Sequence, residues 1–208
     1  HEAALPHGVF NYLPGPGAVV ADFLVDSPKV SVIAFTGSVE VGLRINERAG
    51  RTAQGQTSIK KVICEMGGKN AIIIDEQFDH EEAIRSILYS AFGYQGQKCS
   101  ACSRLIVVDG VYDRFVPELV EAARKLKIGP AEDPRNYLGP VIDARAQRRI
   151  LQYIELAGQE GTILYRSEVP EEGFYVPLTI VEGITPEDRL AQEEVFGPFV
   201  TLIPFDTE

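Results

Sequence analysis

Apolar and polar positions along the chain follow two periods, one typical of buried strands and one of amphipathic helices. Compact apolar runs rich in β-branched residues predict strands at residues 29–38, 60–68, 70–76, 103–110, 174–183 and 199–205. Apolar residues at helical spacing predict helices at residues 19–27, 39–50, 79–92, 111–129 and 143–161. Strands alternating with helices of this length indicate an α/β fold with a mostly parallel sheet flanked by helices.

Composition narrows the class of protein. The 208 residues include 30 acidic and 20 basic side chains, for a formal net charge of -10. This balance argues against a nucleic-acid partner, which requires a basic face. No apolar run approaches the roughly 18 residues of a membrane-spanning helix, so no membrane association is expected. The three cysteines are too few for a disulfide framework, which favours a reducing, cytoplasmic compartment.

The ends of the sequence suggest a segment of a longer protein. The chain begins with His1, its only methionine is Met66, and it stops just after a strand-like run. We therefore expect further segments on both sides.

Cys99 and Cys102 stand in the C-x-x-C spacing that marks redox dithiols and half zinc sites. A thioredoxin-like motif places its first cysteine at a helix N-terminus after a strand, whereas this pair follows a helix and precedes a strand. A zinc site needs two more soft ligands. The remaining candidates are Cys64 and three histidines, of which His1 and His7 lie at the very beginning. No metal site is predicted.

The residues around Cys99 favour a single reactive thiolate. Gly93 and Gly96 allow the backbone to approach a ligand closely at the turn after the helix 79–92. Lys98 adds a positive charge that favours the thiolate form of Cys99. The alternative is that Cys99 and Cys102 are two buried thiols without a role.

Four short segments then resemble, in order, those of the aldehyde dehydrogenase family: "AFTGSVEVG", "CEMGGKN", "GQKCSA" and "EEVFGPF". Taken alone, the first and last are weak signals, typical of a capped turn and of a solvated acidic pair. The resemblance implies that Cys99 is the catalytic nucleophile, that Glu65 is the general base, and that Cys102 is incidental. It also implies a cofactor site formed by Gly37, Ser38, Met66, Gly67, Glu194 and Phe196.

The resemblance also implies a domain organisation. Residues 1–66 would be the rear part of a Rossmann-type dinucleotide-binding domain, and residues 67–208 most of the catalytic domain. The implied cofactor is NAD, with NADP left open because the discriminating residues lie outside this sequence. The implied partner is a small aldehyde, and the parent enzyme would be a homo-oligomer. A rival hypothesis is an inactive folded fragment of such an enzyme.

Longer stretches of sequence around these segments indicate the kind of aldehyde. The stretches "EVGLRINERAG", "KKVICEMGGKNAIIID" and "SAFGYQGQKCSA" resemble the subgroup that oxidises glutamate γ-semialdehyde, the open form of 1-pyrroline-5-carboxylate. By that resemblance Lys98 and Ser100 meet the carboxylate end of the substrate. The alternatives are a solvated Lys98 that only tunes the thiolate, and a different aldehyde. The subgroup also suggests a parent chain that is longer or bifunctional in proline catabolism.

Overall fold

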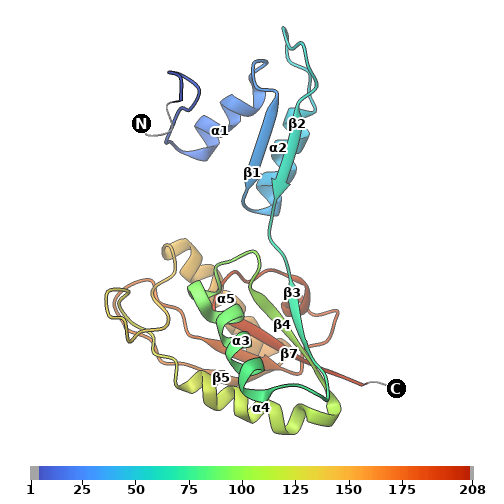
Figure 1. The fold of residues 1–208 in the computed structure, drawn as a ribbon, viewed down its shortest axis with the longest axis vertical. Helices are drawn as coiled ribbons and strands as arrows, with labels where there is room; N and C mark the ends of the chain where they lie inside the picture. Colours follow the sequence, from blue (N-terminus) through green and yellow to red (C-terminus); the bar gives the residue numbers. More distant parts are fainter. Residues whose placement is uncertain (1–4, 207–208) are drawn as a thin grey trace. The chain divides into compact units, whose positions relative to one another are not determined.

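A computed structural model describes residues 5–206, which form two compact units with their boundary between Gly67 and Gly68 (Figure 1). Each unit combines strands with helices, as the alternating periods predict. Among residues 5–206 no helix is long and apolar enough to span a membrane.

The first unit is a small α/β layer. Its elements are α1 (Gly17–Asp26), β1 (Val32–Thr36), α2 (Val39–Ala49) and β2 (Lys61–Glu65). The two strands are parallel, with Val32 opposite Lys61 and Thr36 opposite Glu65, so both strands end at the same edge. A small core joins the helices to the strands through Val25, Ile45 and Ala49, with Ile33, Phe35, Val41 and Val62 packed against it.

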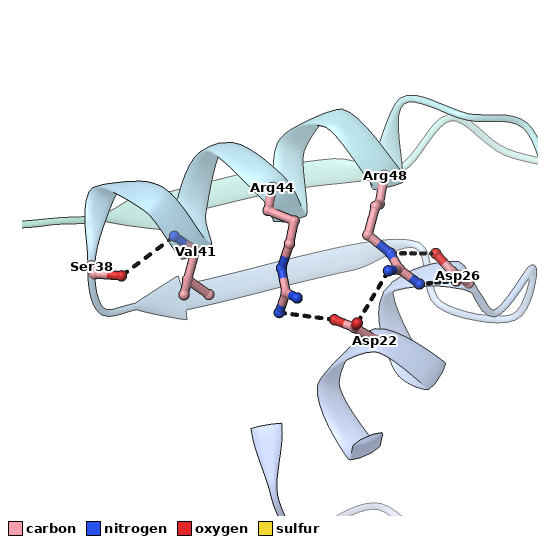
Figure 2. A network of polar contacts seen from close by, with 6 residues as sticks. All are labelled: Asp22, Asp26, Ser38, Val41, Arg44 and Arg48. Atoms are coloured by element: carbon pink, nitrogen blue, oxygen red, sulfur yellow. Dashed lines mark hydrogen bonds and ion pairs between the residues drawn. The ribbon is translucent and has the colours of Figure 1, made fainter. Parts of the chain in front are cut away.

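Ion pairs hold α2 against α1 (Figure 2). Asp22 accepts from Arg44 and from Arg48, each at 3.1 Å, and Arg48 also pairs with Asp26. The Arg48 guanidinium keeps the pKa of Asp26 below its usual value. One exposed ion pair contributes little to the stability of the fold by itself, but Asp22 and Arg48 each bind two partners. The network therefore restrains α2, at whose N-terminus Ser38 lies.

The second unit is built on a five-stranded sheet in the order β3-β4-β7-β6-β5, parallel except for the antiparallel pair β5–β6. The strands are β3 (Asn70–Ile74), β4 (Cys102–Val108), β5 (Thr162–Arg166), β6 (Thr179–Glu182) and β7 (Phe199–Phe205). The helices are α3 (His80–Phe92), the short 3₁₀ turn η1 (Gly93–Gly96), α4 (Asp109–Arg124), α5 (Ala144–Glu160) and α6 (Arg189–Gln192).

Helices cover both faces of this sheet. On one face α3 and α4 bury a cluster that includes Ile87, Phe92, Phe115, Leu119, Leu105, Ile180 and Leu202. On the other face α5 and α6 bury Ile150, Ile154, Leu190, Val181 and Phe199. Neighbouring residues of β6, Ile180 and Val181, therefore point to opposite faces, as side chains of a strand must. The α/β fold with a mostly parallel sheet is confirmed.

Two details of the second sheet differ from the sequence prediction. The strand expected at 174–183 begins only at Thr179, and β5 was not predicted. Pro177 has no N–H for a ladder bond, and Leu178 instead receives a hydrogen bond from the Ser167 N–H. The segment 174–178 therefore approaches the sheet as irregular backbone.

Candidate active site

In the first unit, the predicted cofactor residues meet at the edge where β1 and β2 end. The Gly37 N–H donates to the carbonyl oxygen of Glu65 at 3.0 Å. Ser38 is the N-cap of α2, and its Oγ accepts from the Val41 N–H at 3.3 Å (Figure 2). Exposed N–H groups at a helix N-terminus and the carboxyl ends of parallel strands are favourable places for a phosphate group.

Glu65 and Met66 lie at the same edge. Glu65 is the last residue of β2 and its side chain is exposed. Met66 packs on α2, where a Cβ on Gly42 would lie 2.7 Å from the Met66 sulfur. The methionine fits against the helix because residue 42 has no side chain. Gly67, the last residue of this unit, follows directly.

In the second unit, the chain reverses between α3 and β4, as the glycines predicted. Tyr94 and Gln95 have left-handed backbone angles, and so does Gly96, with φ of +64°. A Cβ on Gly96 would lie 2.1 Å from the carbonyl oxygen of Gly197, so only glycine fits this position. After Gln97, the four residues Lys98–Ala101 form a tight turn closed by a 3.1 Å bond from the Ala101 N–H to the Lys98 carbonyl. We call residues 98–101 the cysteine turn.

The three cysteines differ in exposure. Cys99 is exposed on the cysteine turn, Cys64 is half-buried, and Cys102 is buried at the start of β4. Burial raises the pKa of the Cys102 thiol to about 11. The members of the C-x-x-C pair therefore have opposite environments. A thiol that is buried and protonated is a poor nucleophile, whereas exposure suits Cys99 for that role.

These environments predict selective alkylation. With limiting iodoacetamide at pH 8, Cys99 should be labelled at least about a hundredfold faster than Cys102, because a thiol with a pKa of about 11 is then ionised in roughly one molecule in a thousand. Peptide mass spectrometry of the native protein measures the rates, and denatured protein serves as the control in which all three cysteines react. Equal labelling in the native state contradicts the assignment of Cys99.

The two proposed substrate residues flank Cys99 but differ in their contacts. The Lys98 ammonium donates to the Tyr89 carbonyl at 3.5 Å and lies 5.1 Å from the centre of the Tyr89 ring. Its positive charge therefore also compensates the partial negative charge at the C-terminal end of α3. Ser100 is exposed. Lys98 thus has a structural contact in addition to its predicted role.

Glu194 and Phe196 lie in the segment between α6 and β7. Glu194 Oε1 accepts from the Gly68 N–H at 3.1 Å. Phe196 has a φ of 53°, an uncommon conformation for a residue with a side chain and one often found at functional sites. Gly68, Lys98, Glu194 and Phe196 line the same small hollow. The structure thus brings the predicted ribose and nicotinamide residues beside the cysteine turn.

The neighbouring Glu193, which has no function predicted from the sequence, binds two side chains of the second unit. It accepts from the Tyr153 hydroxyl at 2.8 Å and pairs with Arg189 at 2.8 Å. The Arg189 guanidinium holds its pKa below the usual value. The two adjacent glutamates are therefore distinguished by their partners, and Glu194 is the one that lines the hollow.

Two polar residues at this site were missed by the sequence analysis. The Nζ atom of Lys69 is buried, without a hydrogen-bond partner among residues 5–206, and burial lowers the pKa of Lys69 to about 8. The side-chain amide of Asn70 contacts the cysteine turn. The signal that could have revealed them is a pair of polar residues directly after Gly68 and before the apolar run of residues 71–74. Within residues 5–206, no group of three or more His, Cys, Asp or Glu side chains is arranged to hold a metal ion.

Similarity to known proteins identifies the family of the chain. The model of the aldehyde dehydrogenase family matches residues 1–208, and the chain belongs to this family. A 1-pyrroline-5-carboxylate dehydrogenase from Geobacillus kaustophilus is 48% identical over 202 residues, which cover 97% of the chain and 39% of that protein. A counterpart from Bacillus subtilis is 46% identical over the same length.

Solved structures have the same fold. Proline utilization A from Bdellovibrio bacteriovorus matches with a TM-score of 0.95 and 49% identity, over 98% of this chain and 21% of that chain. The 1-pyrroline-5-carboxylate dehydrogenase from Thermus with bound NAD matches with a TM-score of 0.94 and 44% identity, over 99% and 40%. The chain therefore spans about two fifths of the length of the dehydrogenases that it matches.

Proposed function

We propose that the full-length protein oxidises glutamate γ-semialdehyde, the open form of 1-pyrroline-5-carboxylate, to glutamate with NAD. The observation that carries the proposal is the exposed Cys99 on a tight turn beside the hollow lined by Glu194 and Phe196. The 48% identity to a protein named 1-pyrroline-5-carboxylate dehydrogenase supports the choice of substrate.

Cys99 supplies the chemistry that an aldehyde needs before it can lose hydride. Its thiolate forms a bond to the carbonyl carbon, and the π electrons move to oxygen to give a tetrahedral thiohemiacetal. The backbone N–H of Cys99 is one candidate donor to that oxyanion. When the C–H bond breaks with its electron pair, the carbonyl re-forms and a thioester on Cys99 remains. Water then cleaves the thioester into the carboxylate product and the free thiol.

Glu65 is the proposed base for the hydrolytic step. A carboxylate accepts a proton from water as the water oxygen attacks the thioester carbon, and the proton later leaves to solvent. Glu65 ends β2 with its side chain exposed, and the glycines 67 and 68 that follow give the backbone freedom near it. These features suit a group that must meet a water molecule.

The chain offers separate contacts for parts of the proposed cofactor. NAD, when bound, supplies the acceptor for the hydride. The backbone around Gly37 and the N-terminus of α2 at Ser38 suit the pyrophosphate. Met66 and Gly67 lie beside this edge. Glu194, oriented by the Gly68 N–H, is proposed to accept ribose hydroxyls with its carboxylate, and Phe196 to pack beside the nicotinamide. The choice of NAD over NADP is supported by the NAD-bound relative from Thermus.

The proposed substrate carries a carboxylate that a plain alkyl aldehyde lacks, and Lys98 and Ser100 are its proposed partners. The test is the ratio of kcat/KM for glutamate semialdehyde to kcat/KM for propanal in the full-length enzyme. We expect a large ratio, which Lys98→Met lowers by roughly ten- to a hundredfold, the effect of one charge-assisted hydrogen bond. Methionine keeps the apolar length of the side chain while it removes the charge.

The Tyr89 contact makes a control necessary. Some loss will occur with both aldehydes because Lys98 also binds the Tyr89 carbonyl near the end of α3, next to Cys99. The two aldehydes are therefore compared in each variant at the same pH. If Lys98→Met lowers both rates by the same factor, Lys98 stabilises the cysteine turn and does not bind the substrate carboxylate. If the parent enzyme shows no preference for the acidic aldehyde, the proposed substrate is wrong.

The remaining proposals concern assembly and location. The parent enzyme is proposed to be a homo-oligomer in a reducing, cytoplasmic compartment. The match to proline utilization A also supports a longer proline-catabolic polypeptide as the context of this chain.

A further inference from the structure

Asn70, the first residue of β3, contacts the cysteine turn through its side chain. Its Nδ2 donates to the carbonyl oxygen of Cys99 at 2.6 Å and to that of Ala101 at 3.3 Å. The turn also packs closely on Gly68, two residues before Asn70, since a Cβ on Gly68 would lie 3.3 Å from the Cys99 carbonyl oxygen. One amide group therefore holds two of the four residues of the turn.

An irregularity in the sheet places Asn70 in this position. Asn70 pairs with Cys102, whereas Ala71 pairs with Arg104, so Ser103 is an extra residue on β4. The Ser103 hydroxyl donates to the Asn70 carbonyl at 3.3 Å. An extra residue of this kind bends a strand and redirects its side chains, and such bulges are common beside active sites. Here the bulge follows the cysteine turn directly.

We propose that Asn70 is a positioning residue, which fixes the orientation of the cysteine turn and so the approach of the Cys99 sulfur to the aldehyde. The inference rests on the proposed nucleophilic role of Cys99. Other bonds hold the turn at its ends: the Cys102 N–H donates to Ser90 Oγ at 3.2 Å, and the Lys98 ammonium contacts the Tyr89 carbonyl. Only Asn70, among residues 5–206, bonds the Cys99 carbonyl itself.

The expected effect is on chemistry and not on folding. Asn70 is exposed, so its loss leaves the buried core of the second unit unchanged. Without the amide, the peptide that follows Cys99 can rotate, and the sulfur then samples orientations from which it cannot attack. A displacement of about 1 Å can lower a rate about a hundredfold.

The experiment uses the full-length enzyme and its Asn70→Ala variant. We expect the pre-steady-state burst of NADH to slow by roughly ten- to a hundredfold, while NAD affinity stays unchanged and the melting temperature shifts by less than about 3 °C. The matched control is Ser103→Ala, which removes the other side-chain bond at the bulge and leaves the amide bonds to the turn intact. It should retain at least about half of the parental burst rate.

Asn70→Asp gives an independent readout with nearly the same shape. An exposed aspartate is ionised at neutral pH, so its carboxylate cannot donate a hydrogen bond and repels the two carbonyl oxygens. The burst should therefore slow at least as much in Asn70→Asp as in Asn70→Ala, while NAD affinity again stays unchanged. A residue that only fills space would leave Asn70→Asp near the parental rate.

The outcomes separate this inference from the proposed function. Burst rates within twofold of the parental rate in both Asn70 variants overturn the inference, as does a loss in Ser103→Ala equal to that in Asn70→Ala. Failure of both Asn70 variants to fold assigns the residue to stability and also overturns it. A parallel Cys99→Ala variant tests the proposed function: if that variant keeps more than about one hundredth of the parental rate, the nucleophile is wrong, whatever Asn70 does.

Discussion

Cys99→Ala should lower the rate of NAD-dependent aldehyde oxidation by on the order of 10⁴-fold or more in the full-length enzyme. Without the thiolate no tetrahedral adduct forms, so the carbonyl carbon never becomes a hydride donor. The remaining contacts bind and orient the reactants, which leaves a small residual rate. NADH formation measured at high enzyme concentration determines this residual rate. The affinity of the variant for NAD should be unchanged.

Cys102→Ala is the matched control for this loss. The second thiol is buried, and its raised pKa keeps it protonated, so it has no expected part in catalysis. Its removal deletes one sulfur from the core and should cost stability of about 1 kcal/mol or somewhat more, with kcat/KM within about threefold of the parental value. Equal losses in both variants would indicate that the C-x-x-C pair acts as a unit, which is the redox alternative.

The local features of the fold were predictable because they depend on neighbours in sequence. Asp79 was expected to start α3, and its carboxylate accepts from the Glu82 N–H as a helix cap does. The apolar spacing of 111–129 predicts a helix with one apolar face, and α4 buries that face, including Phe115 and Leu119. Gly93 and Gly96 predicted the reversal that presents Cys99.

The features that sequence analysis missed depend on contacts between distant residues. The strand β5 owes its existence to antiparallel pairing with β6, and its own residues carry no clear alternating pattern. The Tyr89 contact of Lys98 and the Asn70 bonds to the cysteine turn likewise join separate elements. Patterns in one segment cannot specify which polar atoms a second segment will present.

In the candidate site, too, some features depend on neighbours in sequence and others on contacts between separate elements. Motifs identified the residue types that the chemistry needs, and the structure adds how each is held. Glu193 and Glu194 are adjacent and chemically identical, yet Glu193 is bound by Arg189 and Tyr153 while Glu194 receives the Gly68 N–H. Their different environments come from Arg189, four residues before Glu193, and from Tyr153 and Gly68, which are far away in sequence.

Glu65→Gln should separate the two halves of the reaction in the full-length enzyme. Glutamine keeps the size of the side chain and its hydrogen-bonding atoms but cannot accept a proton from water. Formation of the thioester on Cys99 does not need this base, so the first turnover should give a burst of NADH of about one equivalent per active site. Hydrolysis should then slow by roughly 10²- to 10⁴-fold, the usual contribution of a general base.

Two further measurements make this result specific. A stronger nucleophile such as hydroxylamine attacks the thioester without help from a base, so it should restore turnover in Glu65→Gln and leave the residual rate of Cys99→Ala unchanged. Mass spectrometry of the quenched variant should find the acyl group on Cys99. Glu40→Gln, a change at an exposed carboxylate in the first turn of α2, is the matched control and should show normal steady-state turnover. If Glu65→Gln has an unchanged steady-state rate, another group activates the water, because a thioester that hydrolyses at the parental rate has not lost its base.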